Sequence, residues 1–210
     1  RRSSDLPPRT QHEVAKAFAG WLCEGAVAEA ADSMFDHRKT GAATSRWLRQ
    51  LSLSDFAKPL IAAFLERLHA PGARAKERAA DALLQLNARI PAEALAGALS
   101  DVPDLPARAV APLLAQSAPV GELIRLLQHP EERVRVAVVA AARQRGGAEM
   151  AAVVDEASKD PSPLVRVAAL EPTGVWTGWP TSLSKEWQDR LLASLADPAG
   201  DVRNLAVSAL

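Results

Sequence analysis

The feature that most constrains this chain is a short phrase, opened by a proline, that recurs five times along its 210 residues. The copies superimpose without gaps. A small apolar residue stands four positions after each proline, the fifth position is basic, and the eighth is again small and apolar. The prolines are Pro71, Pro103, Pro130, Pro161 and Pro198, and the basic residues are Lys76, Arg108, Arg135, Arg166 and Arg203. Repetition at one short period predicts an array of similar structural units.

The spacing of the prolines fits helical hairpins. They lie 32, 27, 31 and 37 residues apart, and about 30 residues hold two short helices and two turns. Residues 120–128, 150–158 and 183–195 are apolar at helical spacing and predict the first helix of their repeats. The phrase then opens the second helix, with the proline at its first position and Asp160 or Asp197 as the N-cap. The sequence therefore predicts an all-α fold of stacked hairpins.

The phrase Asp-Pro-x-x-x-Val-Arg-x-x-Ala resembles the HEAT-like repeat, in the short bacterial form known from phycobilisome lyase subunits and many scaffold proteins. It is clearest as DPSPLVRVAAL (160–170) and DPAGDVRNLAVSAL (197–210), close at 129–142, and diverged at 70–83 and 102–115. The resemblance implies a right-handed α-solenoid of five HEAT-like repeats over residues 52–210. The last copy stops in mid-helix on an apolar residue, and from this we expect the chain to belong to a larger protein.

Residues 1–51 do not fit the phrase. The first nine are polar and contain proline, which predicts a tail or linker, and 10–51 predict an N-terminal helical cap for the array. The cap would begin with a capping box from Thr10 to Glu13. An apolar stripe follows, and further helices are expected at 26–35 and 42–51. The stripe consists of Val14, Phe18, Trp21 and Leu22.

Composition limits the function classes. Twenty-five basic and twenty-five acidic residues cancel, so no net charge steers the whole chain to nucleic acid or acidic lipid. No apolar run approaches the length needed to cross a bilayer, and Arg1-Arg2 is not followed by the apolar stretch of a signal peptide. The single Cys23 excludes an internal disulfide and indicates a reducing compartment. We expect a cytoplasmic protein.

The repeated basic residue has two interpretations. In HEAT-like families an arginine at this position commonly pairs with the preceding acidic cap and ties adjacent repeats together, which here suggests Asp160 with Arg166 and Asp197 with Arg203. The alternative is a row of cations that binds phosphates. The first interpretation is the stronger, because Arg166 and Arg203 each follow an aspartate by six residues.

The second helices present another row, at positions 2, 6, 10 and 13 after each proline, opposite the core positions. Resemblance to HEAT arrays makes this row the concave surface. It holds four acids and one arginine among small and apolar groups, which suits the apolar face of a protein helix or peptide. Packing between repeats, or plain solvation, is the competing interpretation. The candidate binding residues are Glu132, Val136, Arg143, Val167 and Asn204.

An irregular loop interrupts the fourth repeat. Pro172 and Gly174 should end its second helix early, and the loop that follows lengthens the period and contains Trp176 and Trp179. Tryptophan is enriched at binding hot spots, so these two residues are candidate partner contacts flanking the concave surface. They could instead cover core that the short helix leaves exposed.

No catalytic or cofactor constellation is present in the sequence. The four histidines are scattered, there is no cysteine pair for zinc, and no nucleophile or metalloprotease motif occurs. The basic stretch from His37 to Arg49 could contact nucleic acid. HEAT-like alkylpurine DNA glycosylases are an enzymatic alternative, but Trp187 and Asp189 lie two apart on a helix and so point to different sides. The sequence favours a non-enzymatic scaffold without metal or cofactor, whose partner is a protein, a peptide or another part of the same full-length chain.

Overall fold

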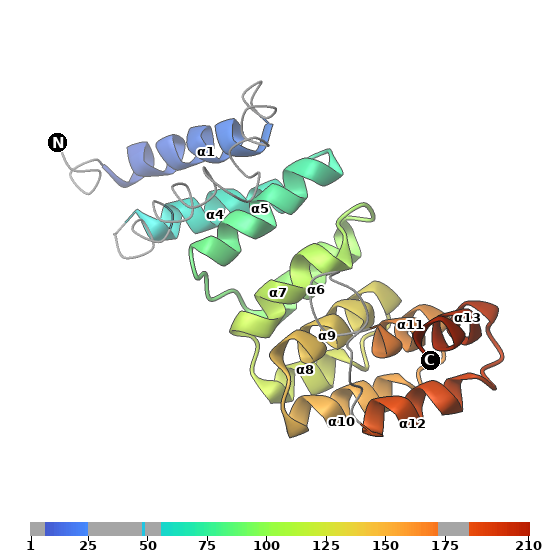
Figure 1. Ribbon diagram of the computed structural model, residues 1–210. Coiled ribbons are helices and arrows are strands. Elements are labelled where there is room, and N and C mark those ends of the chain that lie inside the picture. The colour runs from blue at the N-terminus through green and yellow to red at the C-terminus, as the bar shows by residue number, and fades with distance from the viewer. Residues whose placement is uncertain (1–6, 25–47, 49–55, 172–184) are drawn as a thin grey trace. The chain divides into compact units, whose positions relative to one another are not determined.

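The structure is a computed structural model, and it describes residues 7–24, 48, 56–171 and 185–210. Every regular element in these residues is an α-helix, so the all-α prediction is confirmed. The helices are α1 (Pro8–Glu24), α4 (Ala57–Leu68), α5 (Ala73–Gln85), α6 (Ala92–Asp101), α7 (Ala107–Ser117), α8 (Val120–Leu126), α9 (Glu132–Arg145), α10 (Ala148–Ala157), α11 (Pro163–Leu170), α12 (Lys185–Ser194) and α13 (Gly200–Ala209) (Figure 1).

Each proline phrase lies between two helices and leads into the second of them. Four of the second helices begin two residues after the repeated proline, and α7 begins four residues after Pro103. The prediction that the proline occupies the first helical position was therefore wrong. The proline lies in the turn that precedes the helix, where its fixed φ shapes the turn and its missing N–H costs no helical hydrogen bond.

Asp160 and Asp197 do not cap the second helices. The N-cap positions are Ser162 for α11 and Ala199 for α13, and neither has a side-chain capping bond. Each aspartate instead accepts the backbone N–H two residues later, from Ser162 or Ala199, at 2.8 Å. This is an Asx turn, in which the carboxylate closes the turn rather than the helix.

The chain divides into two compact units, Arg1–Ser117 and Ala118–Leu210. In unit 1, α1 packs against α4 and α5, α5 also contacts α7, and α6 packs on α7. The core of this unit is aliphatic, with Phe64 as the largest side chain that is completely buried. The expected helices at 26–35 and 42–51 lie outside the described residues, except for Leu48, which is helical and buried.

Helix α1 buries a different face from the one predicted. Leu22 is buried as expected, but Val14 is 44% exposed and Trp21 is 49% exposed. Ala15, Ala19 and Cys23 are buried in their place. The helix also begins at Pro8, so Thr10 lies inside it and does not form the expected capping box. Small side chains together with Leu22, rather than Val14 and Trp21, are therefore the buried residues of α1, which packs against α4 and α5.

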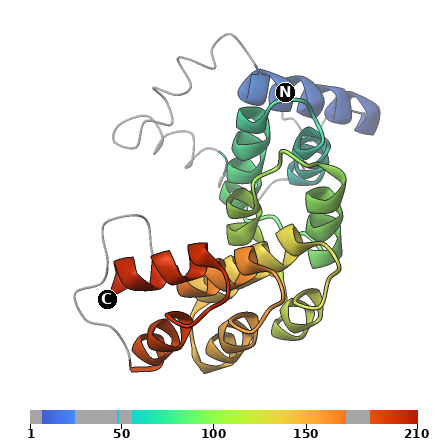
Figure 2. The ribbon, with the colours of Figure 1, turned by 90° about the vertical axis from the view of Figure 1, so that its right-hand side faces the viewer.

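In unit 2 the helices form two rows. Figures 1 and 2 show α8, α10 and α12 in one row and α9, α11 and α13 in the other. Contacts run within each hairpin, along the second row from α9 to α11 to α13, and from α8 to α10. A pair of glycines with positive φ, Gly146 and Gly147, makes the sharp turn from α9 into α10.

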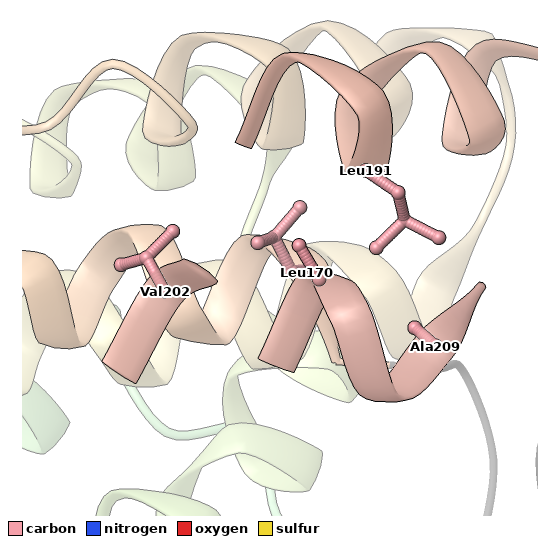
Figure 3. Close-up of a cluster of buried hydrophobic side chains, with 5 residues drawn as sticks. Leu170, Leu191, Val202 and Ala209 are labelled. Carbon is pink, nitrogen blue, oxygen red and sulfur yellow. The ribbon is translucent and has the colours of Figure 1, made fainter. Parts of the chain in front are cut away.

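The far end of unit 2 has its own apolar cluster. Leu191 of α12 faces Leu170 of α11 and Ala209 of α13 (Figure 3), and Val202 and Ala206 complete the buried set. Trp187 of α12 packs against this cluster and is half-buried. Leu195, which directly follows α12 at the end of the apolar stretch 183–195, is 38% exposed. Helix α11 ends at Leu170, which confirms the predicted early end of the fourth repeat.

Candidate functional site

The repeated arginines of unit 2 form a ladder that joins each hairpin to the next. We use the name arginine ladder for Arg135, Arg166 and Arg203 together with Asp160 and Asp197. Arg135 lies on the first turn of α9, and its Nη1 donates to the carbonyl oxygens of His129 and Pro130 at 2.8 and 3.1 Å. Its Nε and Nη2 donate to the two carboxylate oxygens of Asp160 at 2.8 and 3.0 Å.

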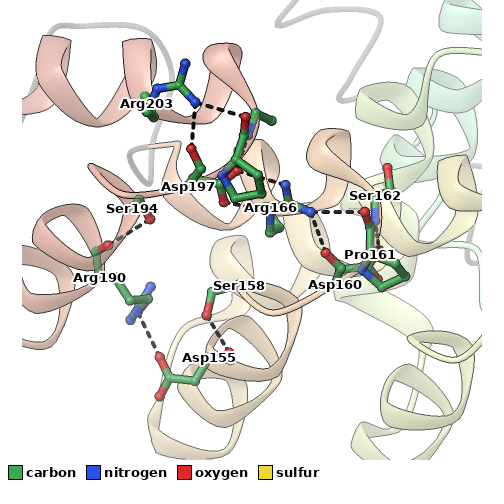
Figure 4. A network of polar contacts seen from close by, with 12 residues as sticks. Asp155, Ser158, Asp160, Pro161, Ser162, Arg166, Arg190, Ser194, Asp197 and Arg203 are labelled. Carbon is green, nitrogen blue, oxygen red and sulfur yellow. Dashed lines mark hydrogen bonds and ion pairs between the residues drawn. The ribbon is translucent and has the colours of Figure 1, made fainter.

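Arg166 repeats this geometry one hairpin later. Its Nη1 donates to the carbonyls of Asp160 and Pro161 at 2.7 and 3.0 Å, and its Nε and Nη2 donate to both oxygens of Asp197 at 2.8 Å (Figure 4). The predicted pairing of Asp160 with Arg166 was therefore wrong. Within its own repeat Arg166 binds backbone carbonyls, and its carboxylate partner comes from the following repeat.

The ladder has two completed rungs, Arg135 with Asp160 and Arg166 with Asp197, and both are largely buried. The side chains of Arg135 and Asp160 are 12% and 7% exposed, and those of Arg166 and Asp197 are 13% and 10% exposed. The hydrogen bonds that Arg135 donates to Asp160 and that Arg166 donates to Asp197 raise the pKa of each arginine. Hydrogen bonds from Arg166, and then from the Ala199 N–H, lower the pKa of Asp197 below its ordinary value, with a smaller contribution from the charge of Arg203. Both rungs are thus held as ion pairs.

Arg203 forms half of a third rung. Its Nη1 donates to the carbonyls of Asp197 and Pro198 at 2.7 and 2.9 Å, the same two contacts that Arg135 and Arg166 make to their own turns. Its Nε and Nη2 have no carboxylate partner among the residues that the structure describes. Arg203 is exposed, in contrast to the two arginines before it.

Unit 1 carries altered versions of the same contact. Lys76 is 2% exposed and pairs with Asp104, which follows the next repeated proline instead of preceding it. Arg108 is 83% exposed at its side chain and pairs backward with Glu77 at 2.9 Å. In the next repeat the position before Pro130 is occupied by His129, which offers no carboxylate. A rung of the ladder type therefore requires Asp-Pro in the following repeat.

We use the name inner row for the predicted concave residues of α9, α11 and α13. Among the candidate binding residues, Glu132, Arg143 and Val167 are half-buried. Glu132 accepts a hydrogen bond of 2.6 Å from the Ser162 hydroxyl, and Val167 packs against the apolar cluster at the end of unit 2. Val136 is half-buried and Asn204 is exposed. The loop residues Trp176 and Trp179, and the basic stretch from His37 to Arg49, lie outside the described residues.

Arg143, the one cation of the inner row, lies in a second polar group. Its Nη1 donates to the Ala168 carbonyl at 2.8 Å and is 3.5 Å from the Glu171 carboxylate. Burial, aided by the nearby charge of Arg190, lowers the pKa of Arg143. Arg190 in turn pairs with Asp155 at 2.8 Å, which joins α12 to α10 (Figure 4). The charges of this group are thus engaged in holding neighbouring hairpins together.

The described residues hold no group of histidine, cysteine or acidic side chains that could bind a metal ion. No helix in the same part of the chain is long and apolar enough to cross a membrane. No protein-family model and no curated protein matches this chain. The resemblance to HEAT-like repeats therefore rests on the repeated phrase alone.

The link between an arginine and the aspartate of the following repeat was missed in the sequence. The phrase compares residues within one repeat, and within it the arginine stands six positions after the aspartate, which favoured that pairing. A signal was present: in the third repeat Arg135 has no preceding aspartate, since His129 occupies that position, yet the fourth repeat supplies Asp160.

Proposed function

We propose that this chain is a non-enzymatic scaffold whose HEAT-like hairpins stack into a right-handed α-solenoid and bind a protein or peptide on the inner row. We further propose that it acts as an interaction module of a larger cytoplasmic protein. The observation that carries the proposal is the arginine ladder. Its arginines are the most regular charged feature of the repeats, and they join one hairpin to the next. A scaffold requires such contacts, because they hold its repeats in a fixed stack.

The ladder also supports a protein partner over nucleic acid, the alternative. Arg135 and Arg166 each have a bidentate carboxylate and two carbonyls as partners, and both are largely buried. An arginine that binds a phosphate must offer free N–H groups to it. Arg135 and Arg166, two of the repeated cations that could have formed a phosphate-binding row, are therefore occupied by the protein's own oxygens.

The inner row supports the same choice by its chemistry. In α9 it presents Val136 one helical turn after Glu132, and in α11 it presents Val167. Its arginine, Arg143, already contacts a carbonyl and a carboxylate. Half-buried valines and a nearby acidic group form an apolar binding surface with a negatively charged edge. An amphipathic helix with basic residues along its edges would match that surface.

Val136→Gln tests the site, with Ala152→Gln as the matched control. Val136 lies on the inner row, whereas Ala152 is exposed on α10, in the other row of helices. A partner captured from lysate in the presence of nuclease should bind the Val136→Gln variant about tenfold more weakly and the control normally, since losing one well-packed apolar contact costs about 1–2 kcal/mol. Equal binding by both variants would remove the inner row as the site.

Salt dependence tests the alternative. The probe is a fluorescent 20-base-pair DNA duplex, titrated at low and at physiological salt. The scaffold proposal expects no specific binding at either salt. Tight binding that weakens by about a thousandfold as salt rises from 50 to 200 mM, as expected for six or more phosphate contacts, would establish the nucleic-acid alternative instead.

A further inference from the structure

The start of the third repeat differs from the starts of the two repeats that follow it. Each completed rung of the arginine ladder takes its carboxylate from an aspartate directly before the repeated proline, and the third repeat has His129 at that position. The Nδ1 atom of His129 accepts the Glu131 N–H at 3.1 Å, as Asp160 accepts the Ser162 N–H. An imidazole that accepts at Nδ1 carries hydrogen on its other nitrogen. The His129 side chain therefore closes the turn but offers no acceptor to an arginine.

Two arginines near this position are engaged within their own units. Arg108, the repeated cation of the second repeat, donates from Nη2 to Glu77 of α5 at 2.9 Å, and both residues belong to unit 1. Arg145 of α9 donates to the carbonyl oxygen of Ala118, the first residue of unit 2, at 2.7 Å. The boundary between the units, after Ser117, thus falls between α7 and α8, where the ladder is interrupted.

We propose that units 1 and 2 unfold as two separate cooperative units, and that the missing carboxylate at position 129 makes the start of the third repeat the point of separation. In a repeat array, stability is approximately the sum of the stability of each repeat and of the contacts between neighbours. Local unfolding therefore begins where those contacts are weakest. The break is a conformational device, because one unit can open while the other stays folded. The proposal goes beyond the function proposed above and does not rest on it.

Each unit has its own buried core. In unit 1, Leu60 and Phe64 of α4 and Leu114 of α7 are completely buried. In unit 2, Leu123 of α8 and Val138 of α9 are completely buried. Unit 2 also contains the two buried rungs, which join its three hairpins in succession. We therefore expect unit 2 to respond as a whole to a change in any one of its hairpins.

A matched pair of substitutions on either side of the boundary tests the proposal in the full 210-residue chain. Leu114→Ala in α7 and Leu123→Ala in α8 remove the same atoms from two completely buried side chains that are nine residues apart. The measurement is native-state hydrogen exchange, read by mass spectrometry of peptic peptides at increasing urea below the unfolding transition. It gives the protection of the amides of each helix in each variant.

We expect each substitution to act on one unit. Leu114→Ala should lower the protection of the slowest amides of α4 to α7 about thirtyfold or more, as for a buried leucine truncated to alanine, and leave α9 to α11 unchanged. Leu123→Ala should do the reverse. If either substitution lowers protection equally in both units, the chain is one cooperative unit and the proposal is overturned. Should a variant fail to fold by circular dichroism, the milder pair Leu114→Val and Leu123→Val gives the same comparison.

His129→Asp tests the cause of the break. It gives the third repeat the Asp-Pro pair of the fourth and fifth repeats. The control is His129→Asn, because an asparagine keeps an acceptor for the turn but brings no carboxylate. When combined with His129→Asp, Leu114→Ala should lower the protection of α9 to α11 as well, and when combined with His129→Asn it should not. Units that still respond separately with His129→Asp would overturn the missing carboxylate as the cause.

Discussion

The repeated cation makes different contacts in the two units. In unit 2 a planar guanidinium bridges the turn of its own hairpin and the aspartate of the next, with four hydrogen bonds and both partners largely buried. In unit 1 the equivalent residue of the first repeat is Lys76, which is buried but pairs with Asp104, a carboxylate whose side chain is 57% exposed. The equivalent residue of the second repeat, Arg108, is exposed and binds Glu77.

The difference shows that the position of a cation does not by itself determine its structural role. What differs is the partner: an aspartate directly before the next repeated proline is held by its own Asx turn, and both of its oxygens face the arginine. Arginine suits that geometry because its N–H groups form a fixed fork, whereas lysine offers a point charge. Each rung of the ladder thus depends on two successive repeats, one that supplies the arginine and one that supplies the aspartate.

Replacing the repeated cation by an apolar side chain should give the largest difference in stability loss between the two units. Arg166→Met leaves Asp197 with its charge buried and two carbonyls without donors, so we expect a loss of about 3 kcal/mol in the free energy of unfolding. Lys76→Met removes a buried charge and leaves Asp104 in contact with water, so the loss should stay below about 1 kcal/mol. Urea unfolding followed by circular dichroism measures both. Equal losses would contradict the comparison.

Acid should weaken unit 2 through Asp197. Because the folded pKa of Asp197 is lowered, the stabilisation from its rung is fully present above the ordinary value of 3.8 and is lost as the pH falls from there through the folded value. Asp197→Asn should cost about 2 kcal/mol at neutral pH. Urea unfolding across this range should show the wild type approaching the variant as the pH falls. A constant difference would exclude the ion pair as the cause.

Ser162→Ala tests a hydrogen bond from a hydroxyl to a carboxylate in the same interface. The Ser162 hydroxyl donates to Glu132 at 2.6 Å and makes no capping bond to α11, although Ser162 is the N-cap residue. We expect a loss of about 1 kcal/mol in the free energy of unfolding, measured by urea titration. The combined variant Ser162→Ala with Glu132→Gln should add little to that loss. Strict additivity of the two substitutions would show that the hydroxyl acts elsewhere.

Arg108→Ala should have the smallest effect. Its side chain is exposed and its one ion pair, to Glu77, is at the surface, so the free energy of unfolding should change by less than about 0.5 kcal/mol. Thermal unfolding at low and high salt measures it. A loss as large as that of Arg166→Met would mean that the second repeat uses its arginine as the fourth does.

The sequence predicted the all-helical fold and the order of the helices, because apolar spacing and the proline phrase are local signals. It failed where the partner is distant. Arg166 and Asp197 are 31 residues apart, and only packing of one hairpin on the next brings them together. It also failed on α1, where Val14 and Trp21 are exposed while Ala15 and Ala19 are buried. Periodicity identifies an amphipathic helix, but which side is covered depends on how closely its neighbours approach.

The residue types of the candidate site could be read from the sequence, but the contacts that these residues make could not. Glu132, Val136 and Arg143 belong to α9 and Val167 belongs to α11, and these two helices contact each other. The hydrogen bonds from Ser162 to Glu132 and from Arg143 to the Ala168 carbonyl could not be foreseen. Each depends on the register between two hairpins, which a single repeat does not encode.

Because each joint of the ladder takes its arginine from one repeat and its aspartate from the next, the segments of this chain differ in how they could be duplicated. A copy of residues 160–196 brings both an acceptor and a donor, so inserting it after the original would preserve every joint. A copy of residues 129–159 brings Arg135 but places His129 where the carboxylate is needed. Gene duplication, or an engineer lengthening the protein, would therefore succeed more readily with the fourth repeat than with the third.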